Sequence, residues 1–269
     1  MRCHYHGWTY GLDGKRVNAP EMESAADFSP SEIGLVPVSV EAWGPLIFVN
    51  LNEKAGSLNE WLGDIPERTS RYDLQNLVFT DRVEYTIKCN WKLYVENFLE
   101  GYHIPLAHPG LNQILDYRTY TVEDYDNYVL QYGTNKESGE RSNPLVDFKK
   151  KSWEGAGEEA GSQYYWIFPN LMWNLSPDVV QSNVILPVSE EETRVVFDFY
   201  FDNESAKSEE IRQQNIKFSD EVQQEDIDIC ETVQRNLHSS SYDKGRYCPK
   251  RENGVYRFHN LMRQYLQDD

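Results

Sequence analysis

The feature that most constrains the fold is a series of short strand-like segments followed by one long helical pattern. The segments, separated by turn signals, cover residues 163–168, 171–176, 179–187 and 193–202. A helix is predicted from about Ser208 to Leu237, with Ser208 as its N-cap and acidic residues in its first turn. Antiparallel strands followed by such a helix indicate an α+β fold in which the helix covers one sheet face.

The first 52 residues have a different pattern, with short strands and Gly/Asp/Pro turns. We predict a hairpin around Gly14 and a buried strand at 44–51, GPLIFVNL. Downstream we expect a short helix at 57–62 and a strand at 82–88, and the Gly-, Glu- and Lys-rich stretch 136–160 indicates a surface loop. We place a domain boundary near residue 52, which gives domains 1–52 and 53–269.

Charge and composition exclude several classes of partner. The net charge of −18 disfavours nucleic acid and anionic membranes. No apolar run approaches the roughly 20 residues of a membrane helix, and the polar start lacks the apolar core of a secretory signal. The four cysteines form no Cys-x-x-Cys pair, so reduced thiols are expected. We therefore expect a soluble cytoplasmic protein.

Two histidines lie five residues apart, where a predicted helix ends. Asn90 can cap a helix whose apolar residues run from Trp91 to Tyr102, and Pro105 is predicted to end it. Five residues on an unbroken helix rotate by about 500°, so His103 and His108 converge only if the helix breaks between them. Two converging imidazoles suit Zn, Fe, Cu or Ni.

A third ligand is suggested by the long helix. Its apolar stripe is predicted to run from Ile211 to Leu237, with Asp226 in the middle, where an aliphatic residue would be expected. A buried carboxylate without a partner is costly, so Asp226 should meet a cation or face a cavity. By the same pattern, Glu225 at the stripe's edge and Asp228 are expected to be solvated.

Together, His103, His108 and Asp226 match the two-His-one-carboxylate facial triad of non-haem Fe(II) oxygenases. Glu100, one turn before His103, could orient its imidazole. The alternative is that the histidines are ordinary loop residues and that Asp226 is an irregularity at a helix bend.

The N-terminal segment contains a weak metal-binding signal. Cys3 and His6 form Cys-x-x-His within the predicted hairpin, but Rieske [2Fe–2S] centres need two Cys and two His. The complementary pair is not found in this chain. Cys3 and His6 could equally be a plain thiol and a strand histidine.

Three stretches together resemble the α subunits of Rieske non-haem iron ring-hydroxylating oxygenases: CHYHGWTYGLDG, ENFLEGYHIPLAH and QQEDIDICETVQRN. The resemblance implies a helix-grip catalytic domain with a long C-terminal helix, preceded by the C-terminal half of an all-β Rieske domain. It is strongest to the branch that includes choline and carnitine monooxygenases. The upstream Cys-x-His would precede Met1, so the sequence looks N-terminally truncated, and this chain alone is expected to lack electron input and activity.

The same resemblance implies roles for individual residues. His103, His108 and Asp226 would bind Fe(II), while Cys3 and His6 would supply half of the ligands of a [2Fe–2S] cluster. The resemblance assigns catalytic roles to Glu100 and Asn97. Glu100 would carry electrons from the cluster of a neighbouring subunit in a homotrimer, and Asn97 would lie close to the iron. A reductase or ferredoxin would be the electron donor.

The leading hypothesis is therefore an oxidoreductase that uses O₂ to hydroxylate or oxidatively demethylate a small organic substrate. One competitor is a zinc-dependent hydrolase with the same ligands; another is a non-catalytic helix-grip binding domain. Tyr164, Trp166 and Trp173 could line the substrate pocket and hold a quaternary ammonium group or an aromatic ring, or could be core residues.

Overall fold

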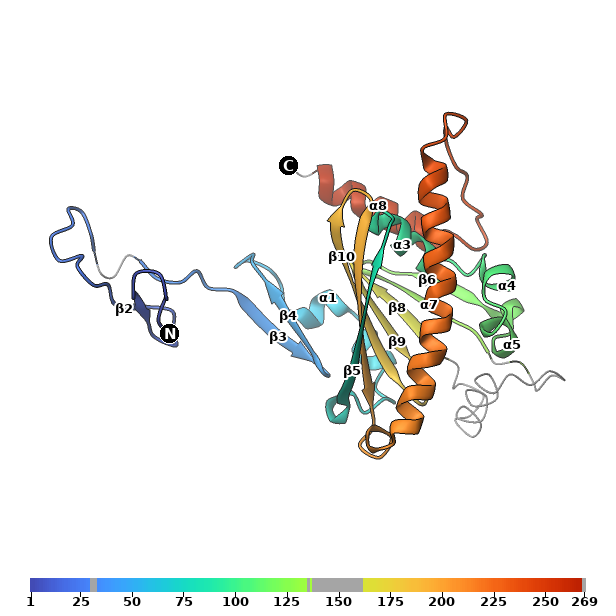
Figure 1. Ribbon diagram of the computed structural model, residues 1–269, viewed down its shortest axis with the longest axis horizontal. Coiled ribbons are helices and arrows are strands. Elements are labelled where there is room, and N and C mark those ends of the chain that lie inside the picture. The colour runs from blue at the N-terminus through green and yellow to red at the C-terminus, as the bar shows by residue number, and fades with distance from the viewer. Residues whose placement is uncertain (30–32, 135, 137–161, 268–269) are drawn as a thin grey trace. The chain divides into compact units, whose positions relative to one another are not determined.

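The computed structural model describes residues 1–29, 33–134, 136 and 162–267 (Figure 1). Apart from Lys136, the predicted loop 136–160 lies outside the described residues. The chain divides into two compact units, Met1–Trp61 and Leu62–Asp269. Among the described residues, no helix is long and apolar enough to cross a membrane.

The first unit consists of two small antiparallel sheets and the start of a short helix. Strand β1 (Thr9–Tyr10) pairs with β2 (Arg16–Asn18), β3 (Ser39–Trp43) pairs with β4 (Leu46–Asn50), and α1 covers Leu58–Leu62. The hairpin and the short helix are thus confirmed, and Gly14 has the positive φ of 77° that favours glycine in a turn.

The prediction that 44–51 forms a buried strand is only half right. Strand β4 forms, but the side chains of Ile47 and Val49 are 75% and 68% exposed. Each of these sheets has only two strands, and a two-stranded ribbon cannot bury its own faces. Apolar alternation therefore identified the strand but not its environment.

The second unit is built on a seven-stranded antiparallel sheet of order β5-β11-β10-β9-β8-β7-β6. The strands are β5 (Val78–Ile87), β6 (Thr121–Asp124), β7 (Tyr128–Tyr132), β8 (Gln163–Ile167), β9 (Leu171–Leu175), β10 (Val180–Ser189) and β11 (Glu192–Phe201). The four predicted strands are confirmed as β8 to β11, and the predicted fifth is confirmed as part of the longer β5. Strands β6 and β7 were not predicted.

The helices of this unit are α2 (Ile65–Arg68), η1 (Leu74–Asn76), α3 (Trp91–Phe98), α4 (Ile104–Ala107), α5 (Leu111–Ile114), η2 (Tyr117–Thr119), η3 (Ser205–Lys207), α7 (Glu209–Leu237) and α8 (Asn253–Gln267). Helices α3, α7 and α8 pack against one face of this sheet, and the other helices lie around it (Figure 1). The core joins sheet and helices through fully buried side chains such as Ile87, Val95, Trp166, Cys230 and Phe258. The α+β fold with its long helix is confirmed, while α8 was not predicted.

Helix α7 starts as predicted, but its buried face differs from the predicted stripe. The Ser208 side chain accepts a hydrogen bond from the backbone N–H of Ile211, which confirms the cap. The predicted C-terminal stripe is wrong, because Val233 and Leu237 are exposed, and the residues actually buried are Asn215, Gln223, Cys230 and Gln234. Polar residues occupy this face because they have partners there: Gln234 Oε1, for example, accepts from the backbone N–H of Asn90.

Candidate metal centre

The chain bends sharply between the segment that carries Asn97 and the segment that carries the histidines. Asn90 caps α3 by accepting from the backbone N–H of Lys92 at 3.0 Å, as predicted. However, α3 ends at Phe98, so the predictions that it continues to Tyr102 and that Pro105 ends it are wrong. Pro105 instead lies in the first turn of α4, where its missing N–H costs little.

Glycine is required at the bend by close packing. A Cβ atom at Gly101 would overlap the ring of Tyr120, which is buried beside it. The chain can therefore turn tightly there, which places His103 immediately before α4 and His108 immediately after it. The predicted break exists, but it is made by the glycine turn rather than by the proline.

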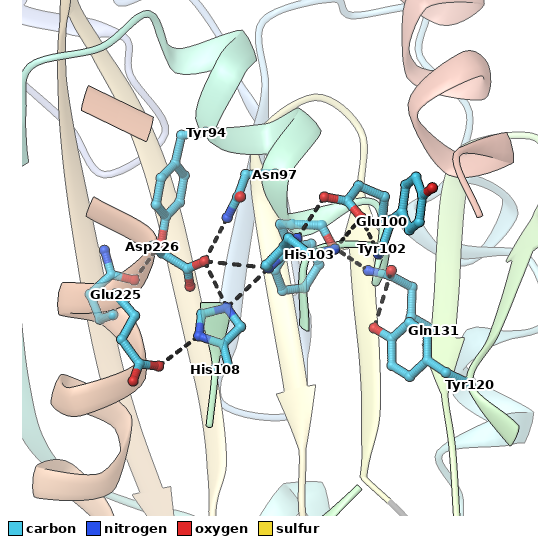
Figure 2. Close-up of polar contacts among 12 residues, drawn as sticks. Tyr94, Asn97, Glu100, Tyr102, His103, His108, Tyr120, Gln131, Glu225 and Asp226 are labelled. Atoms are coloured by element: carbon cyan, nitrogen blue, oxygen red, sulfur yellow. Dashed lines mark hydrogen bonds and ion pairs between the residues drawn. The ribbon is translucent and has the colours of Figure 1, made fainter. Parts of the chain in front are cut away.

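His103 and His108, at the two ends of α4, and Asp226 on α7 point toward one another (Figure 2). His103 Nε2 and His108 Nε2 are 3.0 Å apart, and Asp226 Oδ1 lies 3.1 Å from His108 Nε2 and 3.7 Å from His103 Nε2. Two ligand atoms about 2.1 Å from one ion and at right angles to each other would be about 3.0 Å apart. The spacings of 3.0 and 3.1 Å match that value and the spacing of 3.7 Å corresponds to a wider angle at the ion, so the three atoms could share one metal ion.

The hydrogen bonds on the far side of each imidazole show which atoms are available as ligands. His103 Nδ1 lies 2.6 Å from Glu100 Oε1, and His108 Nδ1 lies 2.7 Å from Glu225 Oε2. An ionised carboxylate can only accept, so both Nδ1 atoms are the donors, and Nε2 is the nitrogen that each ring turns toward the other ligand atoms. Two ring nitrogens and a carboxylate oxygen therefore face one another, an arrangement that a cation would satisfy when both rings are neutral.

The electrostatic setting of the site is acidic and largely shielded from water. The His108 side chain is only 2% exposed. Burial by itself would lower the pKa of His108, but the hydrogen bonds and charges of Asp226 and Glu225 outweigh burial, and the net effect raises that pKa. The three residues form the group of possible metal ligands found among the described residues, and together they could hold a metal ion.

Glu225 is the functional residue that the sequence pattern missed. It was predicted to be solvated, but its carboxylate is hydrogen-bonded to His108, and only about a third of the side chain is exposed. Asp228 is exposed, as predicted. The local sequence gave no signal for Glu225, because its role depends on a histidine 117 positions earlier.

Asn97 and Tyr94, both on α3, connect that helix to α7 beside the ligands. Asn97 Nδ2 donates to Asp226 Oδ1 at 2.6 Å, and Tyr94 Oη donates to Gln223 Oε1 at 2.7 Å (Figure 2). The Asn97 contact fixes the orientation of the Asp226 carboxylate, so the structure brings Asn97 next to the ligands, as the family resemblance implied.

A cavity of about 170 Å³ opens beside the three ligands. Its walls include apolar and aromatic side chains from the sheet and from α7, together with a set of amides: Asn97, Gln131, Asn174, Gln181, Asn183, Asn215 and Gln223. Among the suggested pocket aromatics, Tyr164 lines this cavity. Trp166 instead packs in the core against Phe258, and Trp173 packs against Tyr200.

The register of the sheet explains why Trp173 lies elsewhere. Trp173 is paired with Tyr165, whereas Tyr164 is paired with Asn174. Because successive side chains of a strand point to opposite faces, Trp173 and Tyr164 are on different faces of the sheet. Trp166 shares the face of Tyr164 but lies deeper in the core under α8. Neither tryptophan is among the residues that line the cavity.

Cys3 and His6 lie in the first unit, and both are exposed. The backbone N–H of Tyr5 donates to Cys3 Sγ at 3.5 Å, and the ring of Tyr5 lies against that of His6. Among the described residues, Cys3 and His6 belong to no group of three possible metal ligands. Their role as half of a cluster site stays a prediction.

Comparison with known proteins gives a consistent result. Residues 74–268 match the family described as the ring-hydroxylating α subunit, catalytic domain. Chloroplastic choline monooxygenase of Arabidopsis thaliana is 36% identical over 98% of this chain, which spans 63% of that protein's length. The carnitine monooxygenase oxygenase subunit of Escherichia coli (strain K12) is 30% identical over the whole chain and 72% of its own length.

A solved structure of a quaternary ammonium Rieske monooxygenase has a similar fold. It superimposes with a TM-score of 0.79 at 26% identity, over 98% of this chain and 72% of that one. That structure gives insight into carnitine oxidation by gut microbiota and into inter-subunit electron transfer. Family match, relatives and fold agree with the site geometry, and the chain belongs to the family of ring-hydroxylating oxygenase α subunits.

Proposed function

We propose that this chain is the oxygenase component of a Rieske-type monooxygenase that binds Fe(II) through His103, His108 and Asp226 and oxidises a small quaternary ammonium compound. The observation that carries the proposal is the pair of Nε2 atoms facing Asp226 Oδ1, with each opposite Nδ1 hydrogen-bonded to a carboxylate. Two histidines and one carboxylate leave positions open for O₂ and are the typical ligand set of non-haem Fe(II) oxygenases. Choline and carnitine monooxygenases among the relatives support the substrate class.

Bound iron would supply the activation of O₂, and the protein supplies geometry and proton control. Glu100 and Glu225 hold the Nδ1 protons of the two histidines, which fixes the tautomer that leaves Nε2 free. Asn97 holds the Asp226 carboxylate in place. The cavity walls exclude bulk water and position the substrate beside the ligands.

The route by which electrons reach the metal is inferred from membership of the family. We propose that Glu100 lies on the route by which electrons arrive, because it contacts His103 directly and its side chain is 14% exposed. Its Oε2 also accepts from the backbone N–H groups of Tyr102 and His103, which holds it in place. The electrons would come from the [2Fe–2S] cluster of a neighbouring protomer in a homotrimer, fed by a reductase or ferredoxin. Cys3 and His6, within residues 1–52, would be half of the ligands of such a cluster.

The proposal is tested by metal exchange and oxygen uptake. The protein is loaded anaerobically with Fe(II) or Zn(II) and supplied with choline, a chemical electron donor and air. We expect O₂ uptake and choline oxidation, measured with an oxygen electrode and by mass spectrometry, only with Fe(II), and loss of both in His103→Ala. Turnover with Zn(II) that does not need O₂ would instead establish a hydrolase.

A further inference from the structure

Helix α7 carries three acceptor side chains at intervals of three residues: Asp226, Gln223 and Asp220. Asp226 belongs to the group of metal ligands. Gln223 Oε1 accepts from the hydroxyl of Tyr94 at 2.7 Å. Asp220 Oδ1 accepts from the hydroxyl of Tyr85 at 3.0 Å. Residues three apart on a helix are neighbours, separated by about 4.5 Å along its axis, so the two tyrosine hydroxyls follow the metal ligands along α7 in successive steps.

Tyr94 is the tyrosine beside the metal ligands. It is buried, and its side chain lines the same cavity as His108 and Asp226. Asn97, three residues later on α3, donates to Asp226, so α3 and α7 are held together at two consecutive steps (Figure 2). Tyr94 is therefore the aromatic side chain through which an electron could reach a metal ion bound to these ligands.

Tyr85 on β5 lies one step further from the ligands. It is buried in the same core cluster as Tyr94, and its ring packs edge-to-face on that of Phe197, with 5.2 Å between the ring centroids. Its acceptor, the half-buried Asp220, also accepts from the side chain of the exposed Gln224 at 3.4 Å. The ring of Tyr85 is thus in the core, while its hydrogen-bond acceptor is close to the protein surface.

The two acceptors differ in whether they can take up a proton. A phenol that loses an electron becomes a strong acid and gives its proton to its hydrogen-bond partner. The amide oxygen of Gln223 is too weak a base to keep that proton, whereas the carboxylate of Asp220 can keep it. Burial and the hydrogen bond to Asp220 raise the pKa of Tyr85, so this phenol holds its proton until it is oxidised. If Tyr94 loses an electron, Tyr85 is therefore the group that replaces it.

We propose that Tyr85 is a redox-active residue that supplies one electron, by way of Tyr94, to the metal site, an inference that rests on the proposed binding of Fe(II). The phenolic proton of Tyr85 moves to Asp220 Oδ1, which leaves a neutral phenoxyl radical. With hydrogen peroxide as the oxidant, Fe(II) and Tyr85 each give one electron. The peroxide takes up both electrons and two protons from solvent and becomes two water molecules. In the absence of substrate, Tyr85 would thereby spare the ligands from oxidation.

The first test is EPR spectroscopy of the protein loaded with Fe(II), freed of unbound iron, mixed with hydrogen peroxide without substrate and then frozen. We expect a tyrosyl-radical signal that narrows when the protein contains ring-deuterated tyrosine. Tyr85→Phe should abolish the signal. The matched control Tyr165→Phe, at a fully buried tyrosine on the other face of the sheet, should preserve it. A signal of native size in Tyr85→Phe would overturn the proposal.

The second test separates proton uptake by Asp220 from its structural role. Asp220→Asn keeps an oxygen that can accept from Tyr85 but removes the base, and Asp220→Glu restores the base. We expect loss of the radical signal in Asp220→Asn and its return in Asp220→Glu, with the Co(II) affinity of both variants unchanged in a titration followed by absorption. A native radical yield in Asp220→Asn would mean that the contact is structural only, and would overturn the proposal.

The third test concerns the route through Tyr94. Phenylalanine is much harder to oxidise than tyrosine, so in Tyr94→Phe the signal of the Tyr85 radical should appear more slowly in samples frozen at increasing times. An unchanged rate would contradict the assigned route. A native protein that binds Fe(II) but forms no tyrosyl radical would overturn the inference and leave the proposed function intact, whereas a native protein that binds no Fe(II) would overturn the proposed function as well.

Discussion

The two units of this chain differ in how far their own residues fix their structure. Among the described residues of 1–61, none is buried, and Val40, Ile47 and Val49 are mostly exposed. The sheet unit, in contrast, buries Ile87 and Phe258 completely. The His103–His108–Asp226 group lies in the unit with the core, and Cys3 and His6 lie in the other. A metal site needs ligand atoms held within a few tenths of an ångström, so the packed unit is the one in which such a site can be built in advance.

The largest expected difference between the two units is in the rate of amide hydrogen exchange. We expect the amides of β9 and β10 to exchange at least about a thousandfold more slowly than those of β3 and β4, because the central strands open only with the whole core. Timed exchange of the intact chain, followed by quenching, peptic digestion and mass spectrometry of the peptides, measures this difference. Similar protection in both units would show that 1–61 has a core of its own.

The second comparison between the two units is their effect on the affinity for a metal ion. Asp226→Asn keeps the size of the side chain but removes the anionic ligand. Loss of an outer-shell partner costs about 10- to 100-fold in affinity, so loss of this ligand should cost at least about a hundredfold. The matched control is Cys3→Ser in the other unit, which should leave Co(II) affinity at the His103 site unchanged in a titration followed by absorption. A weaker Co(II) affinity in Cys3→Ser would contradict the assignment.

The smallest effect concerns the removal of a single methylene group. Ile87→Val should lower the free energy of unfolding by about 1 kcal/mol, because Ile87 is fully buried. Ile47→Val, at a position 75% exposed, should change it by less than about 0.5 kcal/mol. Urea denaturation followed by fluorescence gives both values. Equal losses would mean that Ile47 is covered in solution.

Local patterns were sufficient to predict much of the sheet unit. Alternation and turn residues identified β8 to β11, and a cap with acidic residues identified the start of α7. The spacing of Val255, Phe258 and Leu261 is helical and would have revealed α8. Strand β6 has only four residues, two of them acidic, so its place at the sheet edge depends on pairing with β7.

The site was predicted for reasons that were only partly correct. Asp226 was selected as the acid in an apolar stripe, yet the buried face of α7 is largely polar because it borders the cavity. Pro105 was assigned the break that Gly101 provides. Periodicity reports which residues of a helix share a face, but not whether that face meets a core or a polar cavity. That distinction is made by long-range contacts, such as the one between Glu225 and His108.

The contact between Glu225 and His108 also changes the charge balance of the centre. With Glu225 included, three carboxylates surround two neutral imidazoles, the others being Glu100 and Asp226. Their combined charge of −3 exceeds the +2 of a divalent ion, so the loaded centre would carry a net charge of −1. An electron removed from the metal would bring that sum to zero, and the same excess of negative charge would attract a positively charged guest toward the cavity mouth.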